Sequence, residues 1–488
     1  MSTATTDIRT ASRRRTTTRL TWLRERGMGA SILVAAISTA FGVLLLSATG
    51  FIIAVFEADP TIGNTGTLGA VRSIMTFILL GVAVYVSSIV TANTFSTIVA
   101  GRSRRIALLR LIGASARAQR TEVARQGLIV GAIGALVGLV SGTVLAAAGV
   151  ALGIELLDLE NVHYAVLQPA LLIPAVVVTL TTWAAAWAGS RRVLTVTPLE
   201  ALGGSVESSH GDLVHRKGRN ATAIALFVTG GVLLAAGILA GFFTPMGVVV
   251  AFFGGIFSFT GLALGATLVM PPVLRLVGRA LGKSAPARLA AENALRYPER
   301  SSRMAIGVVI GVTLVTMLAV ATESAKGVLA AAAGGELPPE IATTMDTFAA
   351  IMMGLVTVSA IIAGVGLVNL LTLGVVQRRR ELGLLRALGL SNSQVRRVVL
   401  LEATHITITA LATGLLLGII YGWAGAQSLL GFVRVDPDAS FGTTLVAPAV
   451  PLWPIAIVVA ATAALTLIVA VAPTRLATRV TPVQALVE

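Results

Sequence analysis

The chain has 488 residues, of which 55% are hydrophobic and 12% are charged, and its mean hydropathy is +0.89. Charged residues make up about a quarter of an ordinary soluble chain, so the composition excludes a typical soluble protein. The net charge of +15 would suit nucleic-acid binding, but the basic residues lie in clusters between long apolar runs, which indicates a membrane protein with cationic loops. The chain has no cysteine, which excludes disulfides, thiolate metal sites and a cysteine nucleophile.

Ten apolar runs are long enough to cross a membrane, since a helix needs about 20 apolar residues to span roughly 30 Å of hydrocarbon. The sequence therefore predicts an all-α integral membrane protein with about ten transmembrane helices. The runs lie near 29–56, 70–98, 127–153, 168–189, 221–242, 246–274, 304–322, 347–375, 403–431 and 450–472.

The charges between the runs predict the orientation, because Lys and Arg concentrate in cytoplasmic loops. With the N-terminus inside, the inner segments hold 34 of the 37 Lys and Arg, and only Arg72, Lys326 and Arg434 lie outside. The 22 acids divide evenly, which leaves about +23 inside and −8 outside. Both termini are therefore expected in the cytoplasm. The strong preference for Arg over Lys and the abundance of Ala, Gly and Val suggest a GC-rich bacterial genome, so the expected location is the bacterial cytoplasmic (plasma) membrane.

An internal repeat gives the domain organisation. Residues 104–115 read RRIALLRLIGAS, and 379–391 read RRELGLLRALGLS; an offset of 276 aligns the two stretches. Each repeat closes on a similar motif, TPLEAL at 197–202 and TPVQAL at 481–486, where the register has drifted by eight residues.

Four segments follow from this repeat. They are a basic N-terminus at 1–28, a first four-span unit at 29–202, a linker with two connecting spans at 203–290, and a second four-span unit at 291–488. Six spans separate the starts of the two units, so both units have the same orientation. The sequence thus predicts a parallel repeat, an internal pseudo-dimer about an axis along the membrane normal.

The segment between the second and third spans of each unit is basic and amphipathic. In the second unit Leu382, Leu385 and Leu388 recur every three residues; Gly389 is expected to end the helix, and Ser391 to cap the next one. The first unit repeats the pattern and ends on Gly113 and Ser115. Such a segment either lies on anionic lipid or docks into a groove of a cytoplasmic motor protein, and its presence in two copies favours docking.

At this point the chain resembles the FtsX/MacB family of ABC transporter permeases, also called type VII. The stretch RRRELGLLRALGLSNSQVRRVVLLEA followed by a Gly-rich span carries the likeness, as do the two closing motifs and AENALRYPERSSRMAIGVVIGV at 291–312. The second unit matches well, whereas in the first Arg105 stands where Glu381 does and Gln126 where Glu402 does. The four-two-four arrangement of spans resembles the long single-chain branch of the family, with two FtsX-like units.

The resemblance implies a permease without its own ATPase site, bound to cytoplasmic ABC ATPase subunits, with two copies expected per chain. ATP and Mg would bind those subunits, so no cofactor or metal is expected on this chain. The function implied is ATP-driven export of a hydrophobic or amphipathic substrate such as a drug, peptide antibiotic, haem or lipid, with membrane lipid as a further partner and no nucleic acid. The expected ATPase-coupling residues are Arg105, Leu109, Arg110, Gly113, Arg380, Glu381, Leu385, Arg386 and Gly389.

Several residues within or beside the spans carry weaker hypotheses. Asn93 and Asn369 are equivalent and are expected either to join helices by hydrogen bonds or to meet at the pseudo-two-fold interface. Two glycine stripes, one beginning at Gly134 and one at Gly414, indicate close helix packing. His405 is expected to be a packing residue rather than a proton relay. The stretch Gly282-Lys283-Ser284 lacks the glycine spacing and the strand of a phosphate-binding loop.

Two other functions stay open. The first is an ion-gradient-driven multidrug carrier, which the lack of acids at the centres of the spans disfavours. The second is a scaffold that passes the motion of an ATPase to an outside enzyme without transport. The outer loops at 57–69 and 323–346 are short, which makes a scaffold for an outside partner the less favoured alternative.

Overall fold

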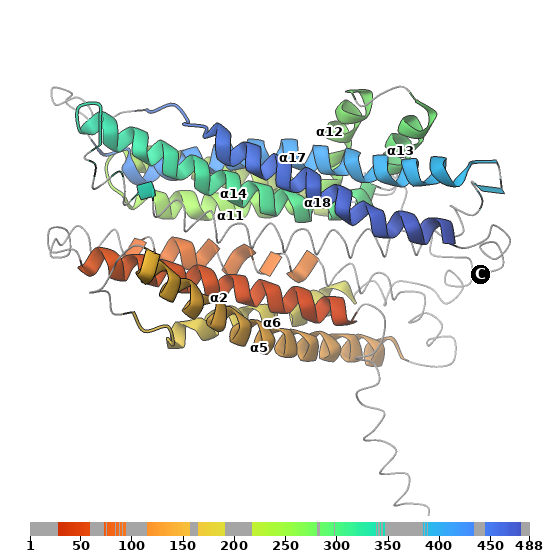
Figure 1. Cartoon of the computed structure of the whole chain (residues 1–488), viewed down its shortest axis with the longest axis horizontal. Coiled ribbons are helices and arrows are strands. Elements are labelled where there is room, and N and C mark those ends of the chain that lie inside the picture. Colours follow the sequence, from red (N-terminus) through yellow and green to blue (C-terminus); the bar gives the residue numbers. More distant parts are fainter. Residues whose placement is uncertain are drawn as a thin grey trace, which may run out of the picture.

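The structure is a computed structural model of the whole chain. It describes residues 28–58, 73–93, 115–156, 164–190, 217–280, 284–337, 389–433 and 445–479, without positions 75, 83, 87, 90 and 297, together with the isolated residues 339, 342, 345, 346, 384, 386 and 387. In the described part, helices run side by side along the long axis of the molecule, and no strand occurs (Figure 1).

The first unit contributes α2 (Met28–Ala58), the span Thr76–Asn93, α5 (Ala116–Leu156) and α6 (Leu172–Gly189), which a short 3-10 helix (Pro169–Leu171) introduces. The second contributes α14 (Pro298–Ala332), α17 (Asn392–Leu430) and α18 (Leu452–Arg479). Between the units lie α10 (Lys217–Gly241), α11 (Gly247–Leu264), α12 (Ala266–Ala280) and α13 (Ala285–Arg296). The prediction of an all-α membrane protein is confirmed.

The helices agree with nine of the ten predicted spans. Eight described helices are long and apolar enough to cross a membrane, and the apolar stretch Leu452–Leu467 within α18 falls on the last predicted span. The predicted span at 347–375 lies outside the described residues.

Three predicted spans differ from the helices observed. The third span of each unit begins eleven residues earlier than its apolar run, at Ala116 in α5 and at Asn392 in α17, because a helix continues through polar residues that hydropathy does not score. The run at 246–274 is divided into α11 and α12. The backbone leaves helical geometry at Gly265, with φ −89° and ψ 10°, and α12 contains Pro271 and Pro272.

The two units pack alike. In both, the first span lies against the third, and the third against the fourth. Gly138 and Gly142 of α5 let α2 approach closely at residues 36–43, and Gly414 and Gly418 of α17 do the same for α14 at residues 309–316. The contacted residues of α14 lie at a constant shift of 273 positions from those of α2 (309 − 36 and 316 − 43). The glycine stripes therefore mark the same helix pair in both units.

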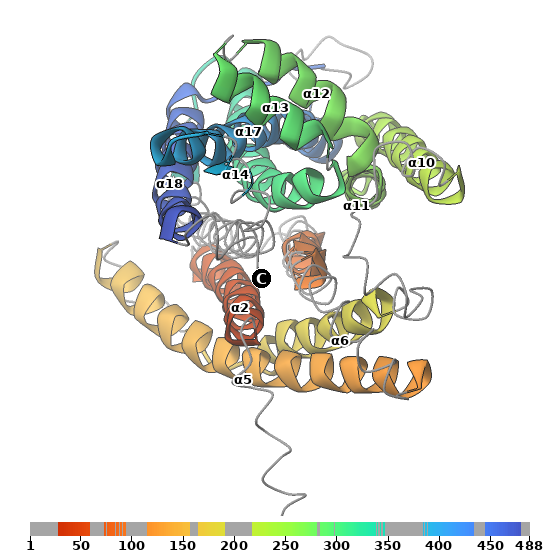
Figure 2. The same ribbon diagram turned by 90° about the vertical axis from the view of Figure 1, so that its right-hand side faces the viewer.

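The connecting spans cover the long third span of only one unit. α10 and α11 pack against each other and against α17, and they lie on the side of the second unit (Figure 2). Where α17 presents Tyr421 and Ser428 to these helices, the equivalent residues of α5, Leu145 and Leu152, are exposed. The pseudo-dimer is thus symmetric in its central packing and asymmetric at its periphery.

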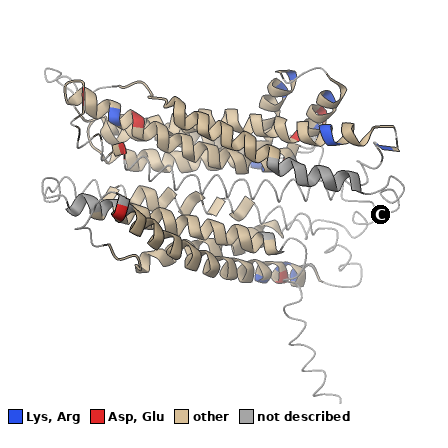
Figure 3. Ribbon diagram, viewed as in Figure 1, with Lys and Arg blue, Asp and Glu red and all other residues tan. Residues whose placement is uncertain are grey.

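Charged residues gather at the two ends of the helices and leave the middle apolar (Figure 3). One end, here called the arginine-rich end, is where α5 and α17 begin and toward which α12 lies (Figure 3). Arg117 and Arg125 lie near the start of α5, Arg397 lies near the start of α17, and Arg275 and Arg279 lie on α12. This end is the predicted cytoplasmic side.

Candidate functional site

The second basic segment turns into α17 through a glycine and a serine. Gly389 has φ +101°, a conformation that favours glycine, and its N–H donates to the carbonyl of Arg386 at 3.0 Å. Ser391 is the N-cap of α17: its hydroxyl accepts the N–H of Gln394 at 3.3 Å, and its own N–H donates to the Gln394 side chain at 2.9 Å. This reciprocal pair is a capping box, so the predicted glycine stop and serine cap are both present.

The first basic segment enters α5 through a simpler cap. Ser115 precedes α5, and its hydroxyl accepts the N–H of Ala118 at 3.2 Å. Ala118 stands where Gln394 does and has no side-chain group to return a hydrogen bond. Both third spans therefore begin at a serine cap directly after a basic segment, and the second cap adds the hydrogen bond to the Gln394 side chain and a hydroxyl contact with Ser393 at 2.8 Å.

Most of the predicted coupling residues lie outside the described part of the chain. This holds for Arg105, Leu109, Arg110, Gly113, Arg380, Glu381 and Leu385. Of the described ones, Arg386 is half-buried and Gly389 is exposed. Leu384, beside the predicted contact Leu385, has 50% of its surface exposed, which makes it a docking candidate that helical periodicity alone did not select.

An arginine–tryptophan contact joins α5 and α6 at the arginine-rich end. The Arg120 guanidinium lies 4.1 Å from the centre of the Trp187 ring, an arrangement that stabilises by about 0.5–2 kcal/mol. Close by on α5, Glu122 pairs with Arg125 at 3.1 Å and accepts a hydrogen bond from Gln126 at 3.3 Å. The base of α5 is thus tied to the fourth span of its unit.

Asn93 joins the two units. It lies at the end of the second span, and its side-chain amide donates to the carbonyl of Arg303 on α14 at 3.2 Å. Arg303 itself pairs with Glu299 at 2.9 Å in the first turns of α14. Asn93 is therefore a contact between the units, while its predicted partner Asn369 lies outside the described residues.

A chain of hydroxyl contacts crosses from the first unit to the second through α11. Tyr85, on the span Thr76–Asn93, lies 2.8 Å from the Thr260 hydroxyl and donates to the carbonyl of Ile256 at 3.3 Å. Two residues from Thr260, the Ser258 hydroxyl lies 2.8 Å from that of Tyr421 on α17. α11 thus connects the span that leads into one basic segment with the helix that follows the other.

His405 and Glu402 are buried on the arginine-rich half of α17. The Nδ1 atom of His405 lies 2.5 Å from the carbonyl of Leu401, so Nδ1 carries the proton and donates. The Cδ2 atom of the ring lies toward Gly278 of α12, and Nε2 has no hydrogen-bond partner in the described part of the molecule. His405 packs as expected, with one ring nitrogen satisfied. No group of three metal-ligating side chains occurs among the residues described.

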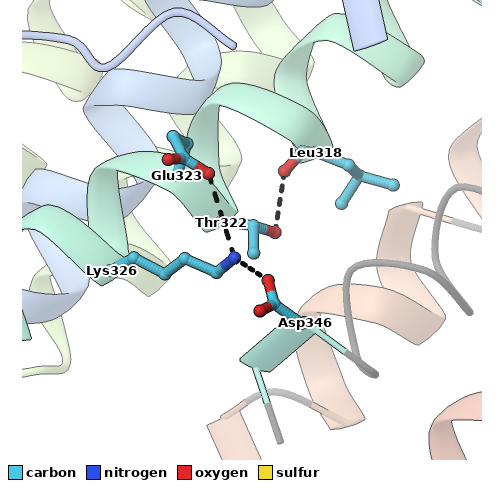
Figure 4. A network of polar contacts seen from close by, with 5 residues as sticks. All are labelled: Leu318, Thr322, Glu323, Lys326 and Asp346. Carbon is cyan, nitrogen blue, oxygen red and sulfur yellow. Dashed lines mark hydrogen bonds and ion pairs between the residues drawn. The ribbon is translucent and has the colours of Figure 1, made fainter. Parts of the chain in front are cut away.

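The opposite end of the bundle is held by loop-to-helix contacts. The segment before α18 is fixed by Trp423, which donates to the carbonyl of Val446 at 2.6 Å, and by the Ser324 hydroxyl, which accepts the N–H of Ala449 at 3.2 Å. Lys326 on α14 lies between Glu323 and Asp346 and pairs with Asp346 (Figure 4).

The segment before α6 packs on α2 in a similar way. Tyr164 hydrogen-bonds to Ser47 at 3.4 Å and places its ring edge-on to Phe51. Burial raises the pKa of Tyr164, and the hydrogen bond to Ser47 partly offsets the rise. Both units thus fasten the approach to their fourth span onto their first span.

Comparison with known proteins gives matches to one family of permeases. The family described as FtsX-like permease C-terminal matches residues 77–198 and 353–482. The two matched segments begin 276 residues apart and end 284 apart, the same shifts that relate the two basic segments and the two closing motifs. Each segment runs from the second span of a unit through its fourth.

The curated relatives are macrolide exporters. The macrolide export ATP-binding/permease protein MacB of Nitrosomonas europaea is 35% identical over 103 residues, which cover 21% of this chain and 15% of that protein. The protein of the same name from Hahella chejuensis is 27% identical over 107 residues, covering 22% of this chain and 16% of the relative. The chain thus aligns with about a sixth of the length of these relatives.

The two family segments together span more than half of the chain, and both enclose a basic segment followed by a serine-capped long helix. The multi-pass helical bundle, the duplicated packing and the similarity to MacB agree with this match. The chain belongs to the FtsX-like permease family and is a multi-pass membrane permease of the ABC transporter type.

Proposed function

We propose that the chain is the permease subunit of an ATP-driven exporter whose ATP is hydrolysed by separate cytoplasmic ABC ATPase subunits, two per chain. The observation that carries the proposal is the duplication: two FtsX-like segments within one chain each contain a basic segment joined to a long third span. Two equivalent docking segments suit two ATPase copies. ATP and Mg bind the ATPase subunits in this proposal, and the permease supplies the membrane pathway.

The proposed mechanism is mechanical transmission. Closure of the ATPase pair on ATP pushes the segments 103–117 and 378–393 toward each other. α5 and α17 extend about eleven residues beyond their apolar runs, or roughly 16 Å, so each acts as a lever that reaches past the bilayer. Small-residue packing at Gly138 and Gly418 lets each lever slide against the first span of its unit. The hydroxyl contacts through α11 support transmission between the units.

The substrate in this proposal is a hydrophobic or amphipathic molecule taken from the membrane. The relatives are named as macrolide exporters, and macrolides belong to this class. The outer loops are short, so the chain itself offers no large outer domain for substrate capture. In this proposal the chain lies in a bacterial plasma membrane with its arginine-rich end and both termini in the cytoplasm. The substrate then moves from the membrane to the outside.

The docking step is tested by copurification with a candidate partner ABC ATPase. Arg386→Ala and Leu385→Ala are expected to reduce both the amount of ATPase recovered and the ATP hydrolysis stimulated by the permease. Arg397→Ala, an exposed arginine six residues beyond the serine cap of α17, is the matched control and should leave both unchanged. Unchanged ATPase recovery and stimulated hydrolysis in the first two variants would remove the docking assignment.

The two alternative functions differ from the proposed exporter: the ion-driven carrier uses another energy source, and the scaffold moves no substrate. An ion-driven carrier would transport substrate in vesicles with an imposed ion gradient and without the ATPase, whereas the exporter requires ATP and keeps its activity when the gradient is collapsed. A non-transporting scaffold would stimulate ATP hydrolysis and move no substrate in either assay. Glu402, a buried acid within a described span, lies toward the arginine-rich end rather than at the middle of α17, which favours the ATP-driven mechanism.

A further inference from the structure

α12 leaves the direction of the bundle directly after a membrane span. α11 runs along the long axis and ends at Gly265, whose N–H donates to the carbonyl of Gly261 at 2.8 Å. α12 and α13 then project sideways from the bundle near the arginine-rich end, as both views show (Figures 1 and 2). Because the long helices run across the membrane, α12 and α13 lie roughly along its surface.

α12 has two apolar faces, and only one of them meets the bundle. Met270 and Leu274 are buried, and α12 packs against α14 and α17. On the opposite side of the helix, Val269 and Leu276 are exposed, Leu276 with 65% of its surface. Residues 269, 272 and 276 follow the helical spacing of three and four, so the exposed apolar residues form one face. A second apolar face on a surface helix requires an apolar neighbour.

Arginines border this second face. Arg275 and Arg279 are one turn apart on α12 and exposed, and their positions place them along one edge of the apolar face. α13 buries Ala287, Ala290 and Ala294 and presents a charged face outward. The two helices together, here called the α12–α13 hairpin, carry Arg275, Arg279, Arg288 and Arg296 against the single acid Glu292.

The apolar and basic residues of this surface indicate what binds to it. Aliphatic side chains beside arginines on a helix lying along a membrane are typical of an interfacial helix, whose apolar face enters the acyl boundary while its cations meet anionic headgroups. The hairpin continues directly from the span α11, so lipid is already its neighbour. A soluble partner would place Leu276 of α12 against a polar protein surface, and an uncharged lipid would offer no counter-charge to the exposed Arg275 and Arg279.

We propose that the α12–α13 hairpin binds anionic phospholipid headgroups of the leaflet at the arginine-rich end, with the Val269 and Leu276 face of α12 inserted at the boundary between headgroups and acyl chains. The hairpin packs on α17 and precedes α14, so the bound lipid anchors the start of the second unit in the membrane. The site is separate from the docking segments and does not depend on export.

The chain lacks cysteine, which permits a site-specific test. Leu276→Cys carries a nitroxide label, and the full chain is placed in vesicles of phosphatidylcholine alone or of phosphatidylcholine with phosphatidylglycerol. The depth of the label is measured from its collisions with oxygen and with a water-soluble nickel chelate. The label is expected at the headgroup boundary and deeper when phosphatidylglycerol is present, and raised salt should reverse this deepening.

Charge variants separate the lipid site from general electrostatics. In the labelled chain, Arg275→Gln with Arg279→Gln should abolish the phosphatidylglycerol-dependent shift, while Arg275→Lys with Arg279→Lys keeps it. Arg117→Gln with Arg125→Gln removes the same charge from α5 and should leave the shift intact. A label that stays in water in both vesicles, or that becomes covered only when the partner ATPase is added, would overturn the proposal. The salt response of the unsubstituted labelled chain decides the matter if the glutamine variant does not fold.

Discussion

At the residue scale, the turn between the second basic segment and α17 depends on two residues, one through its backbone and one through its side chain. Gly389 supplies a backbone conformation that other L-residues rarely adopt, and Ser391 satisfies an N–H at the start of a helix that reaches past the membrane. Both follow from sequence, because a glycine and a serine two residues apart between apolar helical patterns are a stop and a start signal. In the proposed mechanism, this turn sets the direction in which α17 follows the proposed docking segment.

Replacement of Gly389 is expected to disturb docking in a graded order. At φ +101° a β-carbon is strained although no atom lies within 4 Å of its position, so the cost is conformational and amounts to roughly 1–2 kcal/mol. Gly389→Asn should lose less ATPase binding than Gly389→Ala, and Gly389→Val should lose most, since asparagine tolerates positive φ better than alanine. Equal ATPase recovery for the three variants in a pull-down would show that the turn does not position the docking segment.

The hydroxyl contact between Ser258 of α11 and Tyr421 of α17 supports a second prediction at this scale. Tyr421→Phe removes the contact with Ser258 between α17 and α11 and keeps the ring, so the expected loss of stability is about 0.6–1.7 kcal/mol, the range for interhelical hydrogen bonds in membranes. The measurement is the thermal unfolding midpoint of the purified chain in detergent. Tyr164→Phe, whose hydroxyl makes the longer 3.4 Å contact, is the control and should change the midpoint less.

At the element scale, the close approach of the first and third spans is the most specific packing in each unit. A β-carbon on Gly138 would lie 2.1 Å from the carbonyl oxygen of Ala36, and one on Gly418 would lie 2.5 Å from the β-carbon of Thr316. Neither neighbour is the end of a flexible side chain, so the helices would have to separate. Each unit thus uses a glycine stripe to hold its lever helix close to its first span.

Alanine at these positions should therefore destabilise the bundle. Gly138→Ala and Gly418→Ala are each expected to cost about 1–3 kcal/mol through overpacking. Gly149→Ala on α5 and Gly425→Ala on α17 provide controls on the same helices, since a β-carbon there meets no atom within 4 Å, and alanine favours a helix by nearly 1 kcal/mol over glycine. Unfolding midpoints that fall in the first pair and hold or rise in the second would confirm the close approach; equal changes in all four would contradict it.

The elements show how far sequence reasoning reaches. Hydropathy located the described spans because their apolar runs exceed the bilayer thickness. It missed the first eleven residues of α17, where charged side chains such as Arg396 and Arg397 continue the helix. It also merged α11 with α12, since residues 266–270 are as apolar as a span and the change of direction at Gly265 arises from packing of Met270 and Leu274 on the second unit.

At the scale of the whole molecule, duplication explains the central packing and divergence explains the periphery. The repeat in the sequence predicted two equivalent units, and the matching helix pairs and the two family segments bear out the FtsX-like duplication. It could not predict that α10 and α11 cover α17 and leave the equivalent face of α5 exposed, because a repeat specifies which residues correspond and not which surface an inserted helix pair packs on. Leu145 of α5 stands where Tyr421 of α17 does. The sequence alone does not show that Leu145 lies on an uncovered face and Tyr421 against α11; the packing shows it.

The same divergence predicts unequal docking segments. Arg105 reverses the charge found at Glu381, and Ala118 removes the reciprocal half of the cap that Gln394 makes with Ser391. The first segment is therefore both electrostatically different and less firmly fixed to its lever helix than the second. Arg386→Ala is expected to lower permease-stimulated ATP hydrolysis more than Arg110→Ala, although the two arginines are equivalent in the repeat. Steady-state hydrolysis by the reconstituted complex measures the difference. Equal losses would mean that the two ATPases engage the pseudo-dimer symmetrically, and that the changes at Arg105 and Ala118 do not bear on coupling.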